Sequence, residues 1–286
     1  MAGLEGKICV ITGATSGIGL ATAERLMGMG ARLILVGRDA EKGRATREEL
    51  AARKPDAEIE TLTGDLGRLA GVRDLARRIA ERAPRIDVLI NNAGAIFDRR
   101  AENGDGLERT FALNHMAYYL MTRLLEAPLK AAAPSRVVVV ASTAHRGVSL
   151  DFDDLQCRDR YSGWTAYRRS KLANILFTRR LSRHLAGSGV TANCLHPGFV
   201  ASRFGDNNSG MFRTSLAIGK KMLAISTERG AETSVHVATA PELAGMSGLY
   251  FDQCRPAAPS VAAQDDEAAE RLWQESARIA GLPAWN

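Results

Sequence analysis

The stretch KICVITGATSGIGLATAERL, residues 7–26, decides the fold. An apolar run at 7–12 leads directly into a glycine-rich turn at 13–19 and then into a helical pattern. Glycines let such a turn bring its backbone close to a ligand, and the free N–H groups that begin the helix stabilise a phosphate. The spacing is GxxxGxG, which alone fits a simple turn as well. Its place between a strand and a helix predicts a dinucleotide-binding turn.

The same alternation continues along the chain. Apolar, β-branched runs lie at 7–12, 32–37, 58–63, 87–92, 136–142 and 190–196, with a shorter one at 247–251. Helical patterns lie between and after them at 18–29, 40–53, 68–82, 107–131, 165–186 and 228–238. Strands that alternate with helices form right-handed βαβ units and a parallel sheet covered on both faces. We therefore expect an α/β fold: one Rossmann-type domain, residues 1–286, with a doubly wound sheet of about seven strands.

Two long connections interrupt this rhythm, at 143–164 and 199–227. Both follow the carboxyl end of a predicted strand, which is where open α/β sheets bind ligands, so we assign both to the substrate. The C-terminal extension, 256–286, carries a charged helical pattern. We expect its apolar face to pack on the domain through Leu272, Trp273 and Ile279.

Composition excludes several classes of protein. With 45% hydrophobic and 24% charged residues the chain is not disordered. Its net charge of +6 comes from basic residues intermingled with acidic ones, so we expect a solvated surface rather than a nucleic-acid partner. The four cysteines lack metal-site spacing, which predicts reduced thiols and no metal. No apolar run reaches the roughly 18 to 20 residues of a transmembrane segment, and we expect a cytoplasmic protein.

The end of the second predicted strand bears on the choice of cofactor. An acidic residue there would bind the ribose 2′-hydroxyl of NAD, whereas Gly37 and Arg38 offer space and a guanidinium for a 2′-phosphate. NADP(H) is therefore expected, and NAD(H) less so. The alternative is that Arg38 only pairs with Asp39 in a surface turn.

The next two strand ends fit the same pocket. Asp65, before Leu66, ends the third strand, where its carboxylate can accept a hydrogen bond from the adenine amine. The run NNAG, residues 91–94, ends the fourth, where Asn92, Ala93 and Gly94 let the backbone lie against the cofactor. Each motif alone fits an ordinary turn. Because the ends of these successive strands share one edge of the sheet, however, the motifs can line one pocket.

Tyr167 and Lys171 are the candidate acid/base pair. They are four residues apart in a helical pattern and so share one face. A neighbouring ammonium favours the phenolate, so we expect Lys171 to lower the pKa of Tyr167. A Tyr/Lys pair by itself is far more often a surface coincidence.

Two further residues belong to this prediction. Ser142 ends the fifth strand, where its hydroxyl can bind the substrate oxygen; the alternative is a turn serine. Asn114 lies in the predicted helix 107–131, either facing solvent or in a water-linked proton path to Lys171.

With these motifs the chain resembles the short-chain dehydrogenase/reductase family. The matching residues span most of the chain: TGATSGIG at 12–19, Asp65, NNAG at 91–94, Asn114, Ser142, Tyr167 with Lys171, and Pro197-Gly198. The resemblance implies a catalytic tetrad of Asn114, Ser142, Tyr167 and Lys171. It also places Lys171 on the nicotinamide ribose and Pro197-Gly198 against the nicotinamide. Where relatives have Thr after this pair, the chain has FVAS at 199–202, in which Ser202 takes that place.

Motifs and resemblance together give one set of cofactor-binding candidates. They are Gly13, Thr15, Ser16, Gly17, Ile18, Gly19, Arg38, Asp65, Leu66, Asn92, Ala93, Gly94, Tyr167, Lys171, Pro197, Gly198, Val200 and Ser202. Within the family, the stretches AH at 144–145, SKLANILFT at 170–178 and LHPG at 195–198 are similar to the retinol dehydrogenase and WW-domain oxidoreductase branch.

The predicted activity is NADP(H)-dependent interconversion of a carbonyl and an alcohol on a small molecule. Apolar residues after the sixth strand suggest a lid over a lipophilic substrate, with core packing as the alternative: Phe199, Phe204, Met211, Phe212, Leu216 and Met222. Two other functions stay open, namely reduction of a carbon–carbon double bond, as in the similar protochlorophyllide reductases, and a non-catalytic NADP-binding regulatory role. In many relatives the helices matching 107–131 and 165–186 form a dimer interface, so a homodimer or homotetramer is compatible with the resemblance.

Overall fold

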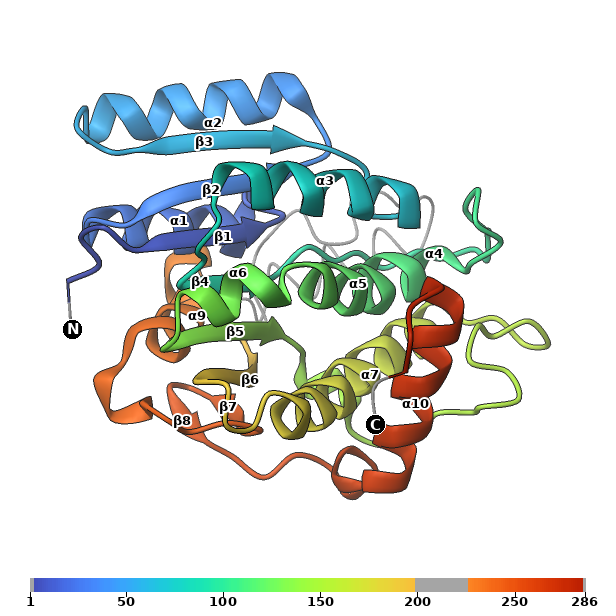
Figure 1. Ribbon diagram of the computed structural model, residues 1–286. Helices are drawn as coiled ribbons and strands as arrows, with labels where there is room; N and C mark the ends of the chain where they lie inside the picture. The colour runs from blue at the N-terminus through green and yellow to red at the C-terminus, as the bar shows by residue number, and fades with distance from the viewer. Residues whose placement is uncertain (1–2, 199–225, 285–286) are drawn as a thin grey trace.

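The computed structural model describes residues 3–198 and 226–284. In that part of the chain one sheet has the strand order β3-β2-β1-β4-β5-β6-β7-β8 (Figure 1). The strands are β1 (Ile8–Thr12), β2 (Arg32–Gly37), β3 (Ile59–Thr63), β4 (Val88–Asn91), β5 (Ser135–Val140), β6 (Val190–His196), β7 (Tyr250–Asp252) and β8 (Arg255–Pro256). The first seven run parallel, which confirms the predicted α/β Rossmann-type sheet.

Two details at the edge of the sheet differ from the prediction. The expected strand 247–251 is β7, three residues long and shifted towards the C-terminus, and β8 pairs with it antiparallel. Strands of two or three residues are too short to show periodicity in a sequence. The order of the strands reverses beside β1, whose neighbours are β2 and β4. Open α/β sheets bind ligands at such a reversal, outside the carboxyl ends of the strands.

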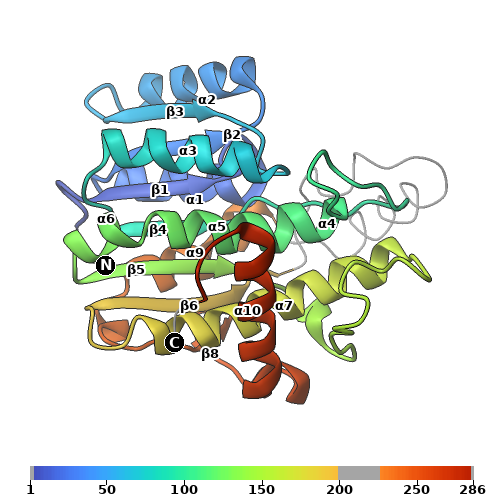
Figure 2. The same ribbon diagram turned by 45° about the vertical axis from the view of Figure 1, so that its right-hand side comes forward.

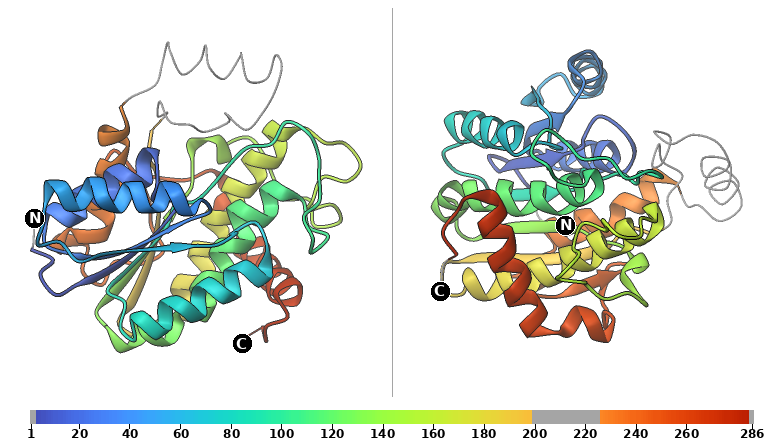
Figure 3. Two further views of the ribbon diagram at one scale, coloured as in Figure 1. Left: turned by 90° about the horizontal axis from the view of Figure 1, so that it is seen from above. Right: turned by 90° about the vertical axis from the view of Figure 1, so that its right-hand side faces the viewer.

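Helices cover both faces of the sheet (Figures 1 and 3). One face packs on α1 (Gly17–Gly28), α2 (Ala40–Arg53) and α9 (Thr227–Thr239), and the other on α3 (Leu69–Arg82), α5 (Ala117–Leu124) and α7 (Gly163–His184). Side chains of β1 alternate between the two cores: Cys9 and Ile11 belong to the first, and Val10 to the second.

The predicted continuous helix 107–131 is wrong. The segment divides into α4 (Arg109–Phe111), a π-helical turn (Ala112–Met116), α5, and α6 (Glu126–Ala131). Pro128 has no N–H to donate to the preceding turn, which accounts for the break before α6. The π-helical turn carries Asn114, which is buried.

The C-terminal helix α10 (Asp266–Ala280) lies across α7, as Figures 1 and 2 show. Leu272 and Trp273 are buried and Ile279 is partly buried against the same core, which confirms their predicted packing. The Trp273 ring stacks on Phe177 and meets Tyr119 edge-on, at centroid distances of 6.1 and 5.1 Å. The helix therefore covers the outer face of α5 and α7. None of the helices in the described ranges is both long and apolar enough to span a membrane.

Candidate active site

The turn between β1 and α1 presents bare backbone at the carboxyl edge of the sheet. Gly13 has φ of 66°, a left-handed conformation that favours glycine. A Cβ on Gly13 would lie 2.8 Å from the Ala93 Cα, and one on Gly19 would lie 2.4 Å from the Gly13 carbonyl oxygen. Side chains are thus excluded where the turn meets the end of β4.

Hydrogen bonds from β1 and β4 hold this turn in place. The Thr12 hydroxyl accepts from the backbone N–H groups of Asn92 and Ala93, at 2.9 and 3.1 Å. The Asn92 amide donates to the Thr12 carbonyl oxygen at 2.9 Å. Asn92, predicted to contact the cofactor, therefore fixes the turn itself. Thr12 was not among the predicted site residues, although it immediately precedes the glycine motif.

The start of α1 fits the pyrophosphate of a dinucleotide. Its N-cap residue, Ser16, makes no side-chain capping hydrogen bond, whereas α2, α7 and α10 are capped by Asp39, Ser162 and Asp265. In the described ranges no side chain accepts from the first N–H groups of α1, and such groups bind phosphate oxygens. A Cβ on Gly37 would lie 2.8 Å from the Thr15 Cγ2, so the ends of β1 and β2 adjoin.

Arg38 follows β2 at this edge and is exposed. The Asp39 carboxylate accepts from the Lys42 N–H at 3.1 Å and pairs with the Lys42 ammonium at 3.6 Å. Arg38 has no hydrogen bond or ion pair to any residue in the described ranges, so the alternative of an Arg38–Asp39 pair is wrong there.

At the end of β3, the exposed Asp65 forms part of a turn. One carboxylate oxygen of Asp65 accepts from the Gly67 N–H at 2.8 Å. Leu66 is buried in the core between the sheet and α3. The bond of Asp65 to the adenine amine stays a prediction.

Tyr167 and Lys171 come together near the N-terminus of α7, behind the end of β5. Tyr167 is 9% exposed, and its side chain is hydrogen-bonded to Ser142. The Lys171 ammonium lies 5.7 Å from the centre of the Tyr167 ring and donates to the Val140 carbonyl oxygen at 2.9 Å. Three of the four predicted catalytic residues thus adjoin one another.

The predicted lowering of the Tyr167 pKa is wrong in this structure. Burial raises the pKa of Tyr167 to about 12, against a smaller lowering by the Ser142 hydrogen bond. Burial also lowers the pKa of Lys171 to about 7, so much of its positive charge is lost near neutrality. The site therefore favours the protonated phenol.

Asn114 is fully buried, which excludes the solvent-facing alternative. Its side-chain oxygen accepts from the Ala95 N–H at 2.9 Å, and its amide donates to the Ala95 carbonyl and the Ser170 hydroxyl. A Cβ on Gly94 would lie 3.2 Å from the Asn114 Oδ1 and 3.7 Å from the Lys171 Nζ. The glycine therefore lets the backbone after β4 lie close to both groups, while a water-linked path between them stays a prediction.

Trp164 is a neighbour of Tyr167 that was not among the predicted site residues. Its ring stacks on the Tyr167 ring, with centroids 5.7 Å apart and planes at 25°. The side chain is 46% exposed, although large apolar side chains are usually buried. The signal in the sequence is its spacing, three residues before Tyr167 on the same helix.

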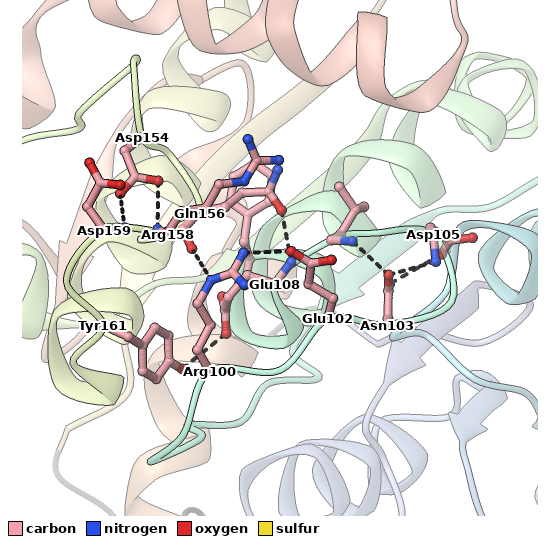
Figure 4. Close-up of polar contacts among 12 residues, drawn as sticks. Arg100, Glu102, Asn103, Asp105, Glu108, Asp154, Gln156, Arg158, Asp159 and Tyr161 are labelled. Atoms are coloured by element: carbon pink, nitrogen blue, oxygen red, sulfur yellow. Dashed lines mark hydrogen bonds and ion pairs between the residues drawn. The ribbon is translucent and has the colours of Figure 1, made fainter.

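The predicted substrate loop 143–164 is anchored to the segment before α4 (Figure 4). The Gln156 side chain accepts from the Glu108 N–H at 2.8 Å, and the Tyr161 hydroxyl lies 3.1 Å from the buried Glu108 carboxylate. Arg100 donates to the Gln156 carbonyl oxygen at 3.4 Å. These contacts fix the loop up to the start of α7, where Trp164 lies.

Beyond β6, Pro197 and Gly198 follow at the same edge, and Gly198 has φ of 89°. His196, just before them, accepts from the Thr143 N–H at 3.3 Å, which ties the ends of β5 and β6 together. The remaining predicted residues lie outside the described ranges. They are Val200, Ser202 and the lid residues Phe199, Phe204, Met211, Phe212, Leu216 and Met222.

Comparison with known proteins agrees with this geometry. A profile of the short chain dehydrogenase family matches residues 7–211. The chain belongs to the short-chain dehydrogenase/reductase family. It is 42% identical to retinol dehydrogenase 13 of Homo sapiens, over 98% of this chain and 86% of that protein, and 39% identical to retinol dehydrogenase 12 of Mus musculus, over 98% and 88%. These relatives confirm the resemblance to the retinol dehydrogenase branch.

Solved structures share the fold. A protein from Mycobacterium paratuberculosis superposes with a TM-score of 0.80 at 31% identity, over 100% of this chain and 97% of that one. RhlG of Pseudomonas aeruginosa, solved as an NADP active-site complex, gives 0.68 at 26% identity, over 93% and 98%. This dehydrogenase/reductase is thus a family oxidoreductase that uses a nicotinamide cofactor.

Proposed function

We propose that this family member is an NADP(H)-dependent oxidoreductase that interconverts a carbonyl and an alcohol on a lipophilic small molecule. The observation that carries the proposal is the adjacency of Ser142, Tyr167 and Lys171 behind the end of β5. These groups share an edge of the sheet with the glycine turn at 13–19.

The side chains act on the oxygen of the substrate, while NADP(H), when bound, supplies or accepts the hydride. Ser142 holds that oxygen by a hydrogen bond, and Tyr167 gives it a proton during reduction. The raised pKa of Tyr167 keeps the phenol protonated at neutral pH, which supports the reductive direction. Lys171 would hold the nicotinamide ribose, and Asn114 fixes the backbone of Ala95.

NADP(H) is proposed over NAD(H) because of Arg38. Its exposed guanidinium has no protein partner in the described ranges and follows the end of β2. A guanidinium binds a phosphate through two parallel hydrogen bonds, which suits the 2′-phosphate. The exposed face of Trp164, stacked on the catalytic tyrosine, supports a lipophilic substrate, as do the names of the retinol dehydrogenases in the same branch.

The test is an NADPH-oxidation screen over aldehydes, ketones, quinones and enones, with NADH as the control. Bulky apolar carbonyls should be reduced to alcohols faster than small polar ones. Tyr167→Phe should lower kcat about 10²- to 10⁴-fold while NADPH still binds, because only the proton donor is lost. Turnover unaffected by this change would contradict the mechanism. A saturated ketone formed from an enone would show the double-bond reductase instead, and NADPH binding without any turnover would show the regulatory protein.

Three wider expectations remain proposals: a single domain, a cytoplasmic location, and a homodimer or homotetramer. The last is constrained by α10, which covers the outer face of α5 and α7. An assembly through those two helices would have to displace the buried Trp273, so we expect any oligomer to use another face. Light scattering coupled to gel filtration measures the mass directly.

A further inference from the structure

His145 is a fully buried histidine immediately behind the catalytic serine. It ends the short 3-10 turn Thr143–His145 that follows Ser142. Its Nδ1 lies 2.6 Å from the Ser142 carbonyl oxygen, and its backbone N–H donates to the same oxygen at 3.2 Å. Both bonds fix the peptide of Ser142, whose hydroxyl bonds Tyr167.

The other ring nitrogen belongs to a contact with the C-terminal extension. The Ser260 backbone N–H donates to the His145 Nε2 at 3.0 Å. An N–H donor needs an unprotonated acceptor, so Nε2 carries no proton and Nδ1 carries the single proton, which it donates to Ser142. The two bonds therefore set the tautomer and the direction of the ring.

The surroundings favour this neutral ring. Burial and the nearby Arg146 lower the pKa of His145, against a raising by the Ser142 carbonyl. The other groups around the ring are Tyr250 of β7, whose ring meets it edge-on at 5.2 Å, and His196 of β6. On the α7 side, Arg168 donates to the carbonyl oxygens of Ala144 and Arg146.

A second bond joins the same two segments. Arg146 donates to the Ala258 carbonyl oxygen at 2.8 Å. The extension thus holds the turn after Ser142 at two adjacent positions, through its own backbone at Ala258 and Ser260.

We propose that His145 is a positioning residue for Ser142, and that the backbone of Ser260 holds it in the active tautomer. This inference rests on the proposed function of Ser142 and Tyr167. The C-terminal extension, which lies more than a hundred residues further along the chain, would therefore support the catalytic serine.

The decisive experiment removes one N–H and leaves His145 untouched. Ser260 has φ of −65°, which proline also adopts, so Ser260→Pro deletes the donor without changing this angle. Ser260→Ala keeps the N–H and is the matched control. We expect Ser260→Pro to lower kcat about 3- to 10-fold, as for the loss of one hydrogen bond, with the Kd for NADPH unchanged and Ser260→Ala equal to wild type.

Substitutions of His145 separate its two bonds. His145→Asn keeps a donor near the Nδ1 position, whereas His145→Gln keeps an acceptor near the Nε2 position. The proposal expects the asparagine variant to retain more of kcat than the glutamine variant, with the KM for NADPH the same in both. Equal kcat in both variants, or a wild-type kcat in Ser260→Pro, would overturn it.

A readout other than activity separates this inference from the proposed function. In ¹⁵N-histidine NMR, His145 should stay neutral with its proton on Nδ1 through the pH range where free histidine titrates, and should begin to titrate in Ser260→Pro. If wild type reduces no carbonyl, the proposed function fails and these signals still decide the tautomer. A proton on Nε2 in the wild type would refute the inference on its own.

Discussion

The turn after β1 and the turn after β5 end parallel strands at one edge of the sheet, but different parts of the chain hold them. The β1 turn is fixed by Thr12, the last residue of β1, and by Asn92, which directly follows the adjacent β4; both belong to the motifs themselves. The β5 turn is tied to β6 through His196, and it is also held from outside the sheet, by Arg168 of α7 and by the backbone at Ser260. The cofactor side is therefore built into the sheet, whereas the proposed catalytic side depends on the C-terminal extension as well.

The largest effect should follow from loosening that extension. Trp273→Ala removes a fully buried ring between Tyr119 and Phe177 and should lower the free energy of unfolding by about 3–5 kcal/mol. Urea denaturation measures it, with the exposed neighbour in Gln274→Ala as the control, expected within about 0.5 kcal/mol of wild type. NADPH affinity in the absence of urea should hardly change. A large loss of affinity would show that the two sides are not independent.

The next effect should break the cofactor side alone. A Cβ at Gly19 would lie 2.4 Å from the Gly13 carbonyl oxygen, while one at Gly28 of the same helix meets nothing within 4 Å. Gly19→Ala should therefore cost about 1–3 kcal/mol of stability and weaken NADPH binding, measured by fluorescence titration. Gly28→Ala should be neutral or stabilising by up to about 1 kcal/mol. Equal affinity in both variants would mean that the turn does not approach the cofactor.

A smaller change tests the end of β2. Arg38→Asp replaces a guanidinium with a carboxylate and should shift the NADPH/NADH ratio of kcat/KM towards NADH by about 10- to 100-fold, since hydrogen bonds to charged groups contribute about 1.5–3 kcal/mol. The nearby Arg44→Asp is the control, because Arg44 is exposed on α2 and pairs with Glu41 on the same helix. An unchanged ratio in Arg38→Asp would leave the NADP preference without support.

The smallest effect concerns the pH dependence of stability on the catalytic side. Burial lowers the pKa of Lys171 from 10.5 to about 7, so between these values the unfolded chain binds more protons than the folded one. The free energy of unfolding should therefore rise with pH, by about 1 kcal/mol between pH 7 and 8, and the cost of the buried charge should be present in full below that range. Lys171→Met should lack this rise in denaturation curves at each pH. The same slope in both proteins would show that Lys171 is solvated.

Errors in the sequence analysis lie where short-range patterns compete with tertiary contacts. The predicted helix 107–131 joined into one element a segment that the structure divides at the π-helical turn and again before α6. The predicted pKa of Tyr167 counted the charge of Lys171 but not the burial of both groups. Trp164 lies three residues before Tyr167, but spacing alone does not distinguish a ring stacked on Tyr167 from one in solvent.

The sequence by itself determined the Rossmann-type sheet, the glycine turn and the shared helical face of Tyr167 and Lys171. These features depend on periodicity, on the absence of Cβ atoms and on spacing within one helix, all of which are local. Only the tertiary structure decided what holds each turn, how deeply Tyr167 and Lys171 are buried, and that Ser260 meets His145. Those contacts join residues up to 115 positions apart, and desolvation depends on everything packed around a group, so neither follows from neighbouring residues alone.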